Sequence, residues 1–325
     1  MTKTASWSVA RLIRNHDAIQ QLLPIVTTNS SLTRYSPKEL LSQFNQSSTL
    51  AVKRSSKQNR FFMYEEHAPV NVKLKDDQMN AQQTITASPN ELATLLQSQS
   101  QFNNNTTSSS DHHYYYTSPI ATSSPNLSPN FQFLQQLRAT NEHPLLDPRG
   151  PSLWMGTSGS GTQCHYDVAN NIIVQLYGSK RVRCYPPSVG LCLHVFPDAH
   201  PRARKSDGDF DRMNNNDDDT LRLRFPHFVD LPQPSLDVIM RPGDAIEIPA
   251  FWFHNVENGR IPFNTITKEE GDDAPSVSVN SFSLSQPMMM AQQIFQKASL
   301  PSPLQLQLGG RGRRNNSATD DTNMR

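Results

Sequence analysis

Apolar and polar residues alternate along the second half of this chain in a way that is typical of β-strands. Residues 276–284, SVSVNSFSL, alternate strictly, and a period of two places successive side chains on opposite faces of a sheet. Residues 171–187, NIIVQLYGSKRVRCYPP, contain apolar runs on either side of Gly178-Ser179, a pair that predicts a two-residue hairpin turn. Residues 236–258, LDVIMRPGDAIEIPAFWFHNVEN, predict a strand, a Pro-Gly-Asp turn and two further strands. Short strands separated by such turn signals predict an all-β jelly roll.

Residues 1–50 follow the spacing of helices instead. Five apolar residues recur at roughly helical intervals: Trp7, Leu12, Ile19, Leu22 and Leu23. Residues 36–44, SPKELLSQF, and residues 88–97, SPNELATLLQ, both begin with Ser-Pro-x-Glu. This motif combines an N-cap serine, a proline at the first helical position and a capping-box glutamate. Residues 60–66, RFFMYEE, are compatible with a strand, so we expect a helical or mixed N-terminal portion.

Changes in composition divide the chain into three parts. Residues 98–113, SQSQFNNNTTSSSDHH, are polar and low in complexity, so we expect a flexible surface loop that includes His112 and His113. Residues 288–300 predict one last short helix before a disordered tail. The predicted parts are an N-terminal region with a low-complexity linker (1–110), a jelly-roll catalytic domain (111–287) and a short helix with a tail (288–325).

Bulk composition narrows the choice of partners only slightly. The formal net charge of +1 gives no argument for or against a nucleic-acid partner. The three cysteines, Cys164, Cys184 and Cys192, form no CxxC pair, and their odd number fits no closed disulfide framework. We therefore expect a reducing compartment, cytoplasmic or nuclear. Because no apolar run approaches the ~20 residues that span a bilayer, we expect no membrane partner.

Three residues are candidates for a single metal site. His165 and Asp167 are two residues apart at the start of the strand-like region, so a strand would point both to one face. His254 follows 87 residues after Asp167, and a closed or sandwiched sheet would bring it back to them. Two histidines and one carboxylate on one face form the facial triad of non-haem Fe(II) oxygenases. A histidine beside aromatic residues is also often a packed core residue, and spacing alone leaves both interpretations open.

Longer motifs around these residues carry a family resemblance. HYDVANNIIVQLYGSKRVRCYPP and GDAIEIPAFWFHNVEN resemble the JmjC-type Fe(II)- and 2-oxoglutarate-dependent oxygenases of the small hydroxylase branch. The resemblance covers about residues 114–286 and extends to the asparaginyl hydroxylases and, more closely, to the tRNA wybutosine hydroxylases. It implies a mainly β fold, a double-stranded β-helix of the cupin-like jelly-roll type, and hydroxylation with Fe(II), 2-oxoglutarate and O₂.

The resemblance also implies roles for individual residues. His165, Asp167 and His254 would hold the metal and act as the catalytic centre, and Lys180 would pair with the distal carboxylate of 2-oxoglutarate. Further cosubstrate-binding residues implied by the family are Thr162, Asn171, Asn280 and Tyr116, the last chosen from the run Tyr114-Tyr115-Tyr116. Without the resemblance, Lys180 reads as a solvated hairpin lysine and Asn280 as a surface residue.

The resemblance leaves the substrate open between tRNA and protein. The alternatives are an asparaginyl- or histidyl-type protein hydroxylase, a histone lysine demethylase and a cupin-like binding module without catalysis. The demethylase lacks support because the chain has no zinc-binding cysteine cluster. A homodimer stays open. Five basic residues are candidates for phosphate contacts: Arg202, Arg204, Lys205, Arg222 and Arg224. A solvated loop explains them equally well, because the acidic insert at 214–219 lies among them.

Overall fold

The computed structural model describes most of the central part of the chain. The described residues are 10–13, 36–56, 60–62, 82–97, 112–125, 150–197, 200, 202–207, 223–259, 274–284 and 290. The C-terminal tail, the acidic insert at 214–219 and, apart from Met290, the predicted last helix lie outside these residues. In the described part of the chain, no helix has the length and apolar character needed to cross a membrane.

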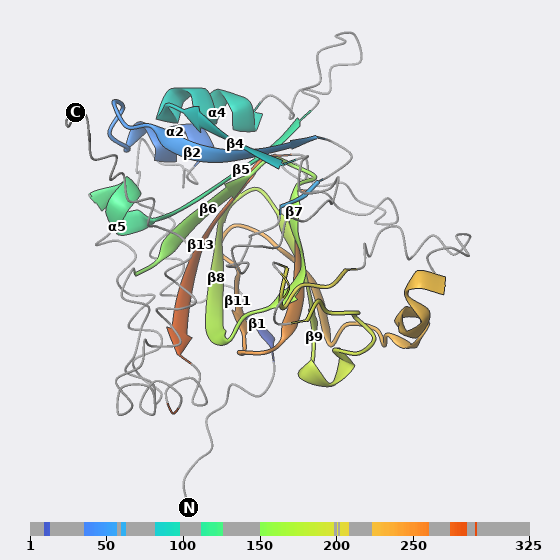
Figure 1. The fold of residues 1–325 in the computed structure, drawn as a ribbon. Coiled ribbons are helices and arrows are strands. Elements are labelled where there is room, and N and C mark those ends of the chain that lie inside the picture. Colours follow the sequence, from blue (N-terminus) through green and yellow to red (C-terminus); the bar gives the residue numbers. More distant parts are fainter. Residues whose placement is uncertain are drawn as a thin grey trace, which may run out of the picture.

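Two largely antiparallel sheets form the body of the molecule (Figure 1). The eight-stranded sheet has the order β1 (Arg11–Ile13), β11 (Ala245–Ile248), β8 (Ala169–Tyr177), β13 (Ser276–Leu284), β6 (Ser152–Gly156), β5 (His112–Pro119), β2 (Leu50–Ser56) and β4 (Gln82–Ala87). The five-stranded sheet has the order β10 (Leu236–Met240), β9 (Lys180–Tyr185), β12 (Phe253–Asn258), β7 (Gly161–Tyr166) and β3 (Phe61–Phe62). Only the pairing of β3 with β7 is parallel among the described strands. The predicted mainly β, jelly-roll fold is confirmed.

The inner faces of the two sheets share one hydrophobic core. Ile173 and Ile246 of the eight-stranded sheet pack with Val182 and Val256 of the five-stranded sheet in a single buried cluster. Burial of such side chains, worth about 1.5–3 kcal/mol each, holds the sheets face to face. This packing brings the remote segments that carry the predicted triad to the same space.

The helical part of the fold is small and covers the outer face of the eight-stranded sheet. Helices α2 (Pro37–Ser42) and α4 (Pro89–Gln97) lie over the β2 and β4 end of that sheet in Figure 1. Leu40 and Leu92 are buried in one cluster with Val174 of β8 and Val279 of β13. The short elements α5 (Ile120–Ser123), η3 (Pro187–Val189) and η4 (Pro226–Asp230) complete the described helices.

The two Ser-Pro-x-Glu motifs begin helices as predicted. At α2, Glu39 N–H donates to Ser36 Oγ over 3.2 Å and Ser36 N–H donates to Glu39 Oε2 over 2.9 Å. Ser88 and Glu91 make the same reciprocal pair before α4. These caps satisfy backbone donors that have no partner inside the helix.

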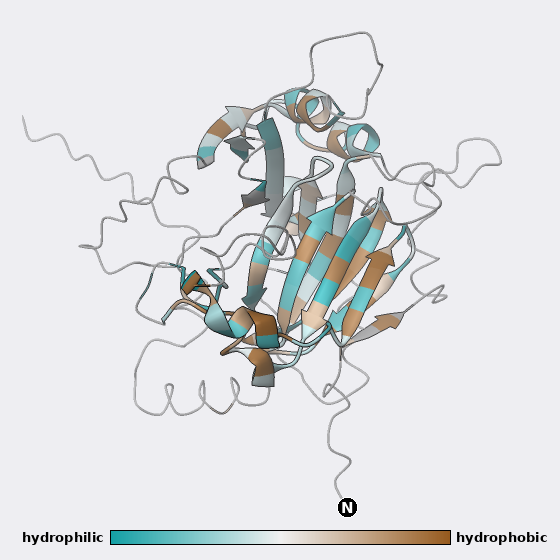
Figure 2. Cartoon of the chain, turned by 90° about the vertical axis from the view of Figure 1, so that its right-hand side faces the viewer, coloured by the Kyte–Doolittle hydropathy of each residue, from teal (hydrophilic) through white to brown (hydrophobic). Residues whose placement is uncertain are grey.

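Strict alternation along the strands of the eight-stranded sheet separates two environments. On β8, Ile172 and Val174 face the helices, while Asn171 and Ile173 face the other sheet. β13 alternates in the same way, with Val279 outward and Asn280 inward. The five-stranded sheet, on the side of β9 in Figure 1, faces the viewer in Figure 2, and its strands carry similar bands of brown and teal. Parity along a strand therefore decides which residues reach the space between the sheets.

Two local predictions in the central part of the chain are wrong. Gly178 and Ser179 do not close a hairpin, because β8 pairs with β11 and β13 whereas β9 pairs with β10 and β12. The turn instead carries the chain from one sheet to the other. His112 and His113 belong to β5 and not to a loop, and His113 is buried with its Nδ1 3.3 Å from Thr157 Oγ1.

Leu12 belongs to a strand and not to a helix. It lies opposite Ile246 at the edge of β11 and packs against the inner core. An open sheet edge offers unpaired backbone groups to any nearby extended segment, and this tertiary pairing overrides a weak helical spacing. The other apolar residues of that predicted helix lie outside the described residues.

Candidate metal centre and cosubstrate cavity

The structure brings His165, Asp167 and His254 together. One ligand atom from each lies within 4.8 Å of the others, and His254 Nε2 is 3.7 Å from Asp167 Oδ2. The two imidazole centroids are 4.3 Å apart because His165 on β7 and His254 on β12 are direct partners across the five-stranded sheet. Asp167 follows β7 at the end of the strand. This spacing is compatible with one ion bound between the three side chains.

Backbone carbonyls determine which nitrogen of each histidine faces the ion site. His165 Nδ1 lies 2.7 Å from the carbonyl oxygen of Gln163, and His254 Nδ1 lies 3.1 Å from that of Trp252. A carbonyl oxygen can only accept, so each Nδ1 carries the proton and each Nε2 keeps its lone pair. Carbonyl groups commonly orient metal-binding histidines in this way.

His165 is held in the neutral form that binds metals. Desolvation, together with the neighbouring His254, lowers the pKa of His165 to about 3. Protonation would place a positive charge in an enclosed site beside a second imidazole, which costs free energy. A neutral histidine pair with one carboxylate is a donor set suited to Fe(II).

A cavity of about 90 Å³ opens beside the triad, several times the ~10–15 Å³ that one water needs. The sequence-predicted residues that line it, besides the triad, are Thr162, Asn171, Lys180 and Asn280. They come from both sheets: Thr162 from β7 and Lys180 from β9, and Asn171 from β8 and Asn280 from β13. The structure thus gathers these four residues around one space.

Several polar atoms of the cavity wall are buried without a partner. Among the residues that the structure describes, these atoms include Thr162 Oγ1, Gln163 Oε1, Asn171 Oδ1 and Asn280 Oδ1. Buried polar groups are normally hydrogen-bonded, and an unpaired one costs about 1–3 kcal/mol. Such a wall suits a polar ligand that supplies the missing partners.

Lys180 places its amine in the same cavity. Its side chain is 4% exposed and donates a hydrogen bond to Ser278 Oγ on β13. Burial lowers the pKa of Lys180 from 10.5 to about 7, because an ammonium group loses its hydration there. An anionic ligand would restore the charge, so the site suits a carboxylate.

The assignment of Tyr116 is wrong on geometry, and Tyr115 lines the cavity instead. Tyr116 lies opposite Met155 of β6, and both side chains belong to the cluster beneath the helices. Tyr115 has the opposite parity on β5 and contacts Phe62 and Trp154, with ring centroids 5.2 and 5.9 Å away. These aromatic side chains form one wall of the cavity. The run of three tyrosines does not indicate which of them faces the cavity, and only the pairing of β5 with β6 determines this.

A bulge in β7 explains how Thr162 and His165 share the cavity although they are three residues apart. His165 lies opposite His254 and Thr162 lies opposite Val256, so Gln163 and Cys164 together face the single residue Asn255. A regular strand would place residues i and i+3 on opposite faces, and the extra residue restores a common face. Cys164 points to a separate apolar cluster.

Sequence reasoning missed other cavity residues. Gln163 enters through the bulge, which has no signal in the sequence. Arg204 and Lys205 also line the cavity, because Lys205 forms a β-bridge with His165. Arg204 has a positive φ of 69°, a strained backbone that is frequently found at functional sites.

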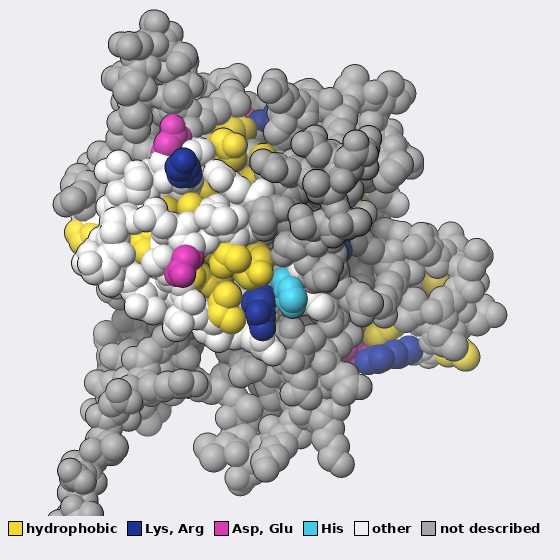
Figure 3. Space-filling model, turned by 90° about the horizontal axis from the view of Figure 1, so that it is seen from above, with side chains coloured by type: hydrophobic (Ala, Val, Ile, Leu, Met, Phe, Trp, Pro, Cys, Tyr) yellow, Lys and Arg dark blue, Asp and Glu magenta, His cyan; other side chains and the backbone are white. Residues whose placement is uncertain are grey.

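The basic residues proposed for phosphate contacts do not form one exposed surface. Arg202 is 2% exposed, with its guanidinium 5.4 Å from the ring centroid of Phe196, so surface contact by Arg202 is ruled out. Lys205 is buried at the cavity. Arg224 is exposed and pairs with Asp207 over 2.8 Å. Arg222 lies outside the described residues. On the face shown in Figure 3, the described Lys and Arg side chains are separated from one another.

The residues present fit a ferrous ion and a keto dicarboxylate. The triad supplies two imidazole Nε2 atoms and one carboxylate, and the cavity supplies a buried amine and unpaired polar atoms. Two facing sheets with such a site between them define a cupin-type jelly-roll protein.

The chain belongs to the cupin-like domain family: the family model matches residues 17–284. The predicted membership among the cupin-like JmjC proteins is confirmed. The match begins well before residue 111, and β2 and β4 extend the same sheet as β5. The division of the chain into three parts stays a prediction.

Similarity to individual proteins is partial. Over 91 residues the chain is 36% identical to the tRNA wybutosine-synthesizing protein 5 of Danio rerio, covering 28% of this chain and 24% of the relative. Over 110 residues it is 26% identical to the lysine-specific demethylase JMJ31 of Arabidopsis thaliana, covering 34% of this chain and 19% of the relative. These matches span a quarter or less of the relatives' length. An X-ray structure of E. coli ycfD aligns with a TM-score of 0.42 and 11% identity, over 98% of this chain and 60% of that one.

Proposed function

We propose that this protein is an Fe(II)- and 2-oxoglutarate-dependent hydroxylase. The observation that carries the proposal is the position of a buried lysine and four unpaired polar atoms in the cavity that adjoins the His-Asp-His triad. A structural metal site would need the triad, but it would not need a desolvated amine and a polar wall beside it.

The proposed roles of the residues are of two kinds, metal binding and cosubstrate binding. His165, Asp167 and His254 hold Fe(II) through two Nε2 atoms and one carboxylate oxygen. Lys180 pairs with the distal carboxylate of 2-oxoglutarate, and Thr162 donates a hydroxyl hydrogen bond to the same group. Charge-assisted hydrogen bonds of this kind are about twice as strong as neutral ones.

The remaining cavity residues orient the cosubstrate and shield it. The amides of Asn171 and Asn280 offer donors and acceptors along its length, and Tyr115 takes the role predicted for Tyr116. The bound iron and 2-oxoglutarate, with O₂, supply the chemistry, in which the keto acid is oxidatively decarboxylated to succinate and CO₂ as a C–H bond is hydroxylated. The aromatic wall of Phe62, Tyr115 and Trp154 excludes bulk water from this space.

The proposal is tested on purified protein under anaerobic conditions. Addition of Fe(II) and 2-oxoglutarate should give the visible charge-transfer absorption of an iron-bound keto acid, and admission of air should yield succinate. Asp167→Ala should show neither signal while keeping the far-UV circular dichroism of the wild type. Failure of the wild-type protein to bind either Fe(II) or 2-oxoglutarate would favour a cupin-like binding module without catalysis.

For the substrate we propose a nucleoside of tRNA. Two observations support this choice: the 36% identity to a tRNA wybutosine-synthesizing protein over 91 residues, and the position of Arg204 and Lys205 at the cavity, where they suit an anionic substrate. Nucleoside mass spectrometry of tRNA from cells with and without the gene tests it. Loss of a hydroxylated nucleoside is expected. The proposed compartment is cytoplasmic or nuclear.

A protein substrate is the second candidate. The similarity to a lysine-specific demethylase favours it. Unchanged tRNA nucleosides, together with 2-oxoglutarate turnover stimulated by a peptide, would replace the RNA proposal with this one.

A further inference from the structure

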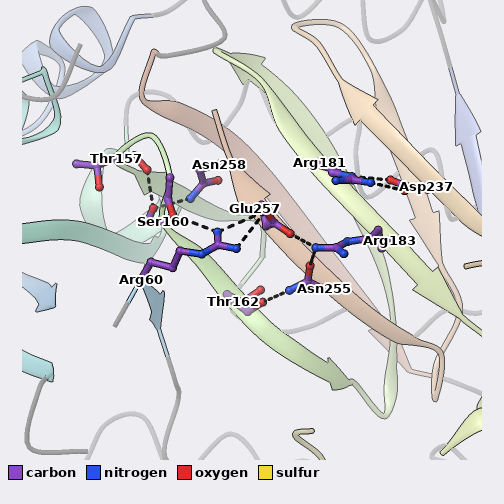
Figure 4. Close-up of polar contacts among 11 residues, drawn as sticks. Arg60, Thr157, Ser160, Thr162, Arg181, Arg183, Asp237, Asn255, Glu257 and Asn258 are labelled. Carbon is purple, nitrogen blue, oxygen red and sulfur yellow. Dashed lines mark hydrogen bonds and ion pairs between the residues drawn. The ribbon is translucent and has the colours of Figure 1, made fainter. Parts of the chain in front are cut away.

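A buried polar network lies on the opposite face of the five-stranded sheet from the cavity. Along β12, His254 and Val256 line the cavity, so Asn255 and Glu257 point to the other face. Figure 4 shows the network running from Arg60 through Glu257 and Arg183 to Asn255 and the backbone of Thr162. None of its side chains lines the cavity, yet the network ends on a strand that does.

Asn255 sits at the bulge of β7 and bonds across it. Its Nδ2 donates to the carbonyl oxygen of Thr162 over 2.9 Å, and its side chain is 1% exposed. A bulge interrupts the regular ladder of backbone hydrogen bonds. A buried carbonyl without a donor costs free energy, and the Asn255 side chain supplies that donor.

Arg183 fixes the orientation of the Asn255 amide. Arg183 Nη2 donates to Asn255 Oδ1 over 2.9 Å, so the NH₂ group must face Thr162. Arg183 also pairs with Glu257, whose other oxygen lies 3.4 Å from Arg60 Nη1. Arg183 and Glu257 are both buried, and buried charges stay ordered when hydrogen bonds satisfy them on several sides.

We infer that Asn255 is a positioning residue that holds the β7 bulge in register and so points Thr162 Oγ1 into the cosubstrate cavity. In this inference the identity of the ligand rests on the proposed function, and the positioning role of Asn255 rests on the hydrogen bonds described above. Asn255 does not touch the ligand. Its effect passes through the Thr162 backbone, because a relaxed bulge would turn the Thr162 side chain away from the face it shares with His165.

Two substitutions separate the donor from the acceptor of the amide. Asn255→Asp keeps the oxygen that accepts from Arg183 and removes the donor to Thr162, whereas Asn255→Leu removes both. Both variants should raise the dissociation constant of 2-oxoglutarate about tenfold, measured by anaerobic titration of the Fe(II) protein, because the lost hydrogen bond is the shared change. Asp237→Asn is the matched control, since it breaks the Arg181–Asp237 pair on the neighbouring strands β9 and β10 and should change the constant less than twofold.

A double-mutant cycle with Thr162→Val distinguishes positioning from general destabilisation. In the Thr162→Val background, Asn255→Asp should change 2-oxoglutarate affinity less than twofold, because the hydroxyl that it positions is gone. A tenfold effect in that background would overturn the inference, as would unchanged affinity in both Asn255 variants.

A structural readout keeps the inference distinct from the proposed function. Hydrogen–deuterium exchange of residues 161–166 should accelerate in Asn255→Asp and stay unchanged in Asp237→Asn. If the wild-type protein binds Fe(II) but no 2-oxoglutarate, the proposed function fails and the role in cosubstrate binding fails with it. Unchanged exchange in Asn255→Asp would overturn the bulge role whatever the protein binds.

Discussion

His254 Nε2 lies 3.7 Å from Asp167 Oδ2 although the two residues are 87 positions apart in the chain. The contact exists because β12 lies between β7 and β9, and His254 is the direct partner of His165 in that sheet. The intervening residues contribute β8 to the other sheet. The ion site is therefore a product of chain topology.

Substitution of a triad residue should abolish metal binding and leave the fold intact. Substitution of a residue that hydrogen-bonds a metal ligand typically lowers metal affinity ~10–100-fold. Asp167 is itself a proposed ligand, so we expect Asp167→Ala to weaken Fe(II) binding by more than this. Isothermal titration with Fe(II) or Co(II) measures the loss. Cys164→Ala is the control, since Cys164 adjoins His165 but packs in a separate cluster. Wild-type metal affinity in Asp167→Ala would contradict the site.

Binding of 2-oxoglutarate should weaken as pH rises through about 7. The pKa of Lys180 is lowered by burial to about 7, so the free protein loses the ammonium charge above that pH. The dianion then has to bind together with a proton, and its dissociation constant should rise by up to about tenfold per pH unit. Titrations between pH 6 and 9 measure this slope. Lys180→Met should bind weakly at every pH without that slope.

Stability should show the linked effect with a defined sign. The folded pKa of Lys180 lies below its ordinary value of 10.5, so between pH 7 and 10.5 the unfolded chain holds more protons. Its contribution therefore stabilises the fold progressively as pH rises through that window. Urea unfolding should show that the free energy of unfolding of Lys180→Met, relative to the wild type, is highest below pH 7. A difference independent of pH would contradict a buried, neutral amine.

The two neighbouring tyrosines should behave differently. Tyr115→Phe removes a phenol oxygen from the cavity, and we expect 2-oxoglutarate affinity to fall on the order of tenfold, the loss of one hydrogen bond to a charged group. Tyr116→Phe should leave affinity unchanged, because Tyr116 packs under the helices beside Phe44. The reverse result would restore the sequence-based choice of Tyr116.

Gly178 should be required at the crossing between the sheets. Its φ is +65°, and a side chain there would collide with the backbone carbonyl of Pro275. Gly178→Ala should cost at least about 1–2 kcal/mol, the strain of a left-handed residue with a Cβ. Gly190→Ala is the control, since Gly190 has a φ of −54° and its substitution would meet only ordinary or slightly tight contacts. Thermal unfolding compares the two.

Patterns within a few residues determined much of this protein. The Ser-Pro-x-Glu motifs predicted the starts of α2 and α4, because a capping box forms between residues three apart. Alternation predicted β13, and the predicted Pro-Gly-Asp turn forms, with Asp244 accepting a hydrogen bond from Arg241 N–H over 2.9 Å. The His-x-Asp spacing also placed His165 and Asp167 together, since neighbours at i and i+2 share a face of a strand.

Pairing between remote strands decided the rest. It placed β9 in a different sheet from β8, drew Leu12 into a strand, and chose Tyr115 over Tyr116. It also inserted the bulge that lets Thr162 and His165 face one cavity. Register depends on which side chains a strand can bury against its neighbours, and those neighbours lie tens of residues away. Local pattern therefore specified the strands and their candidate ligands, and tertiary packing specified which faces meet.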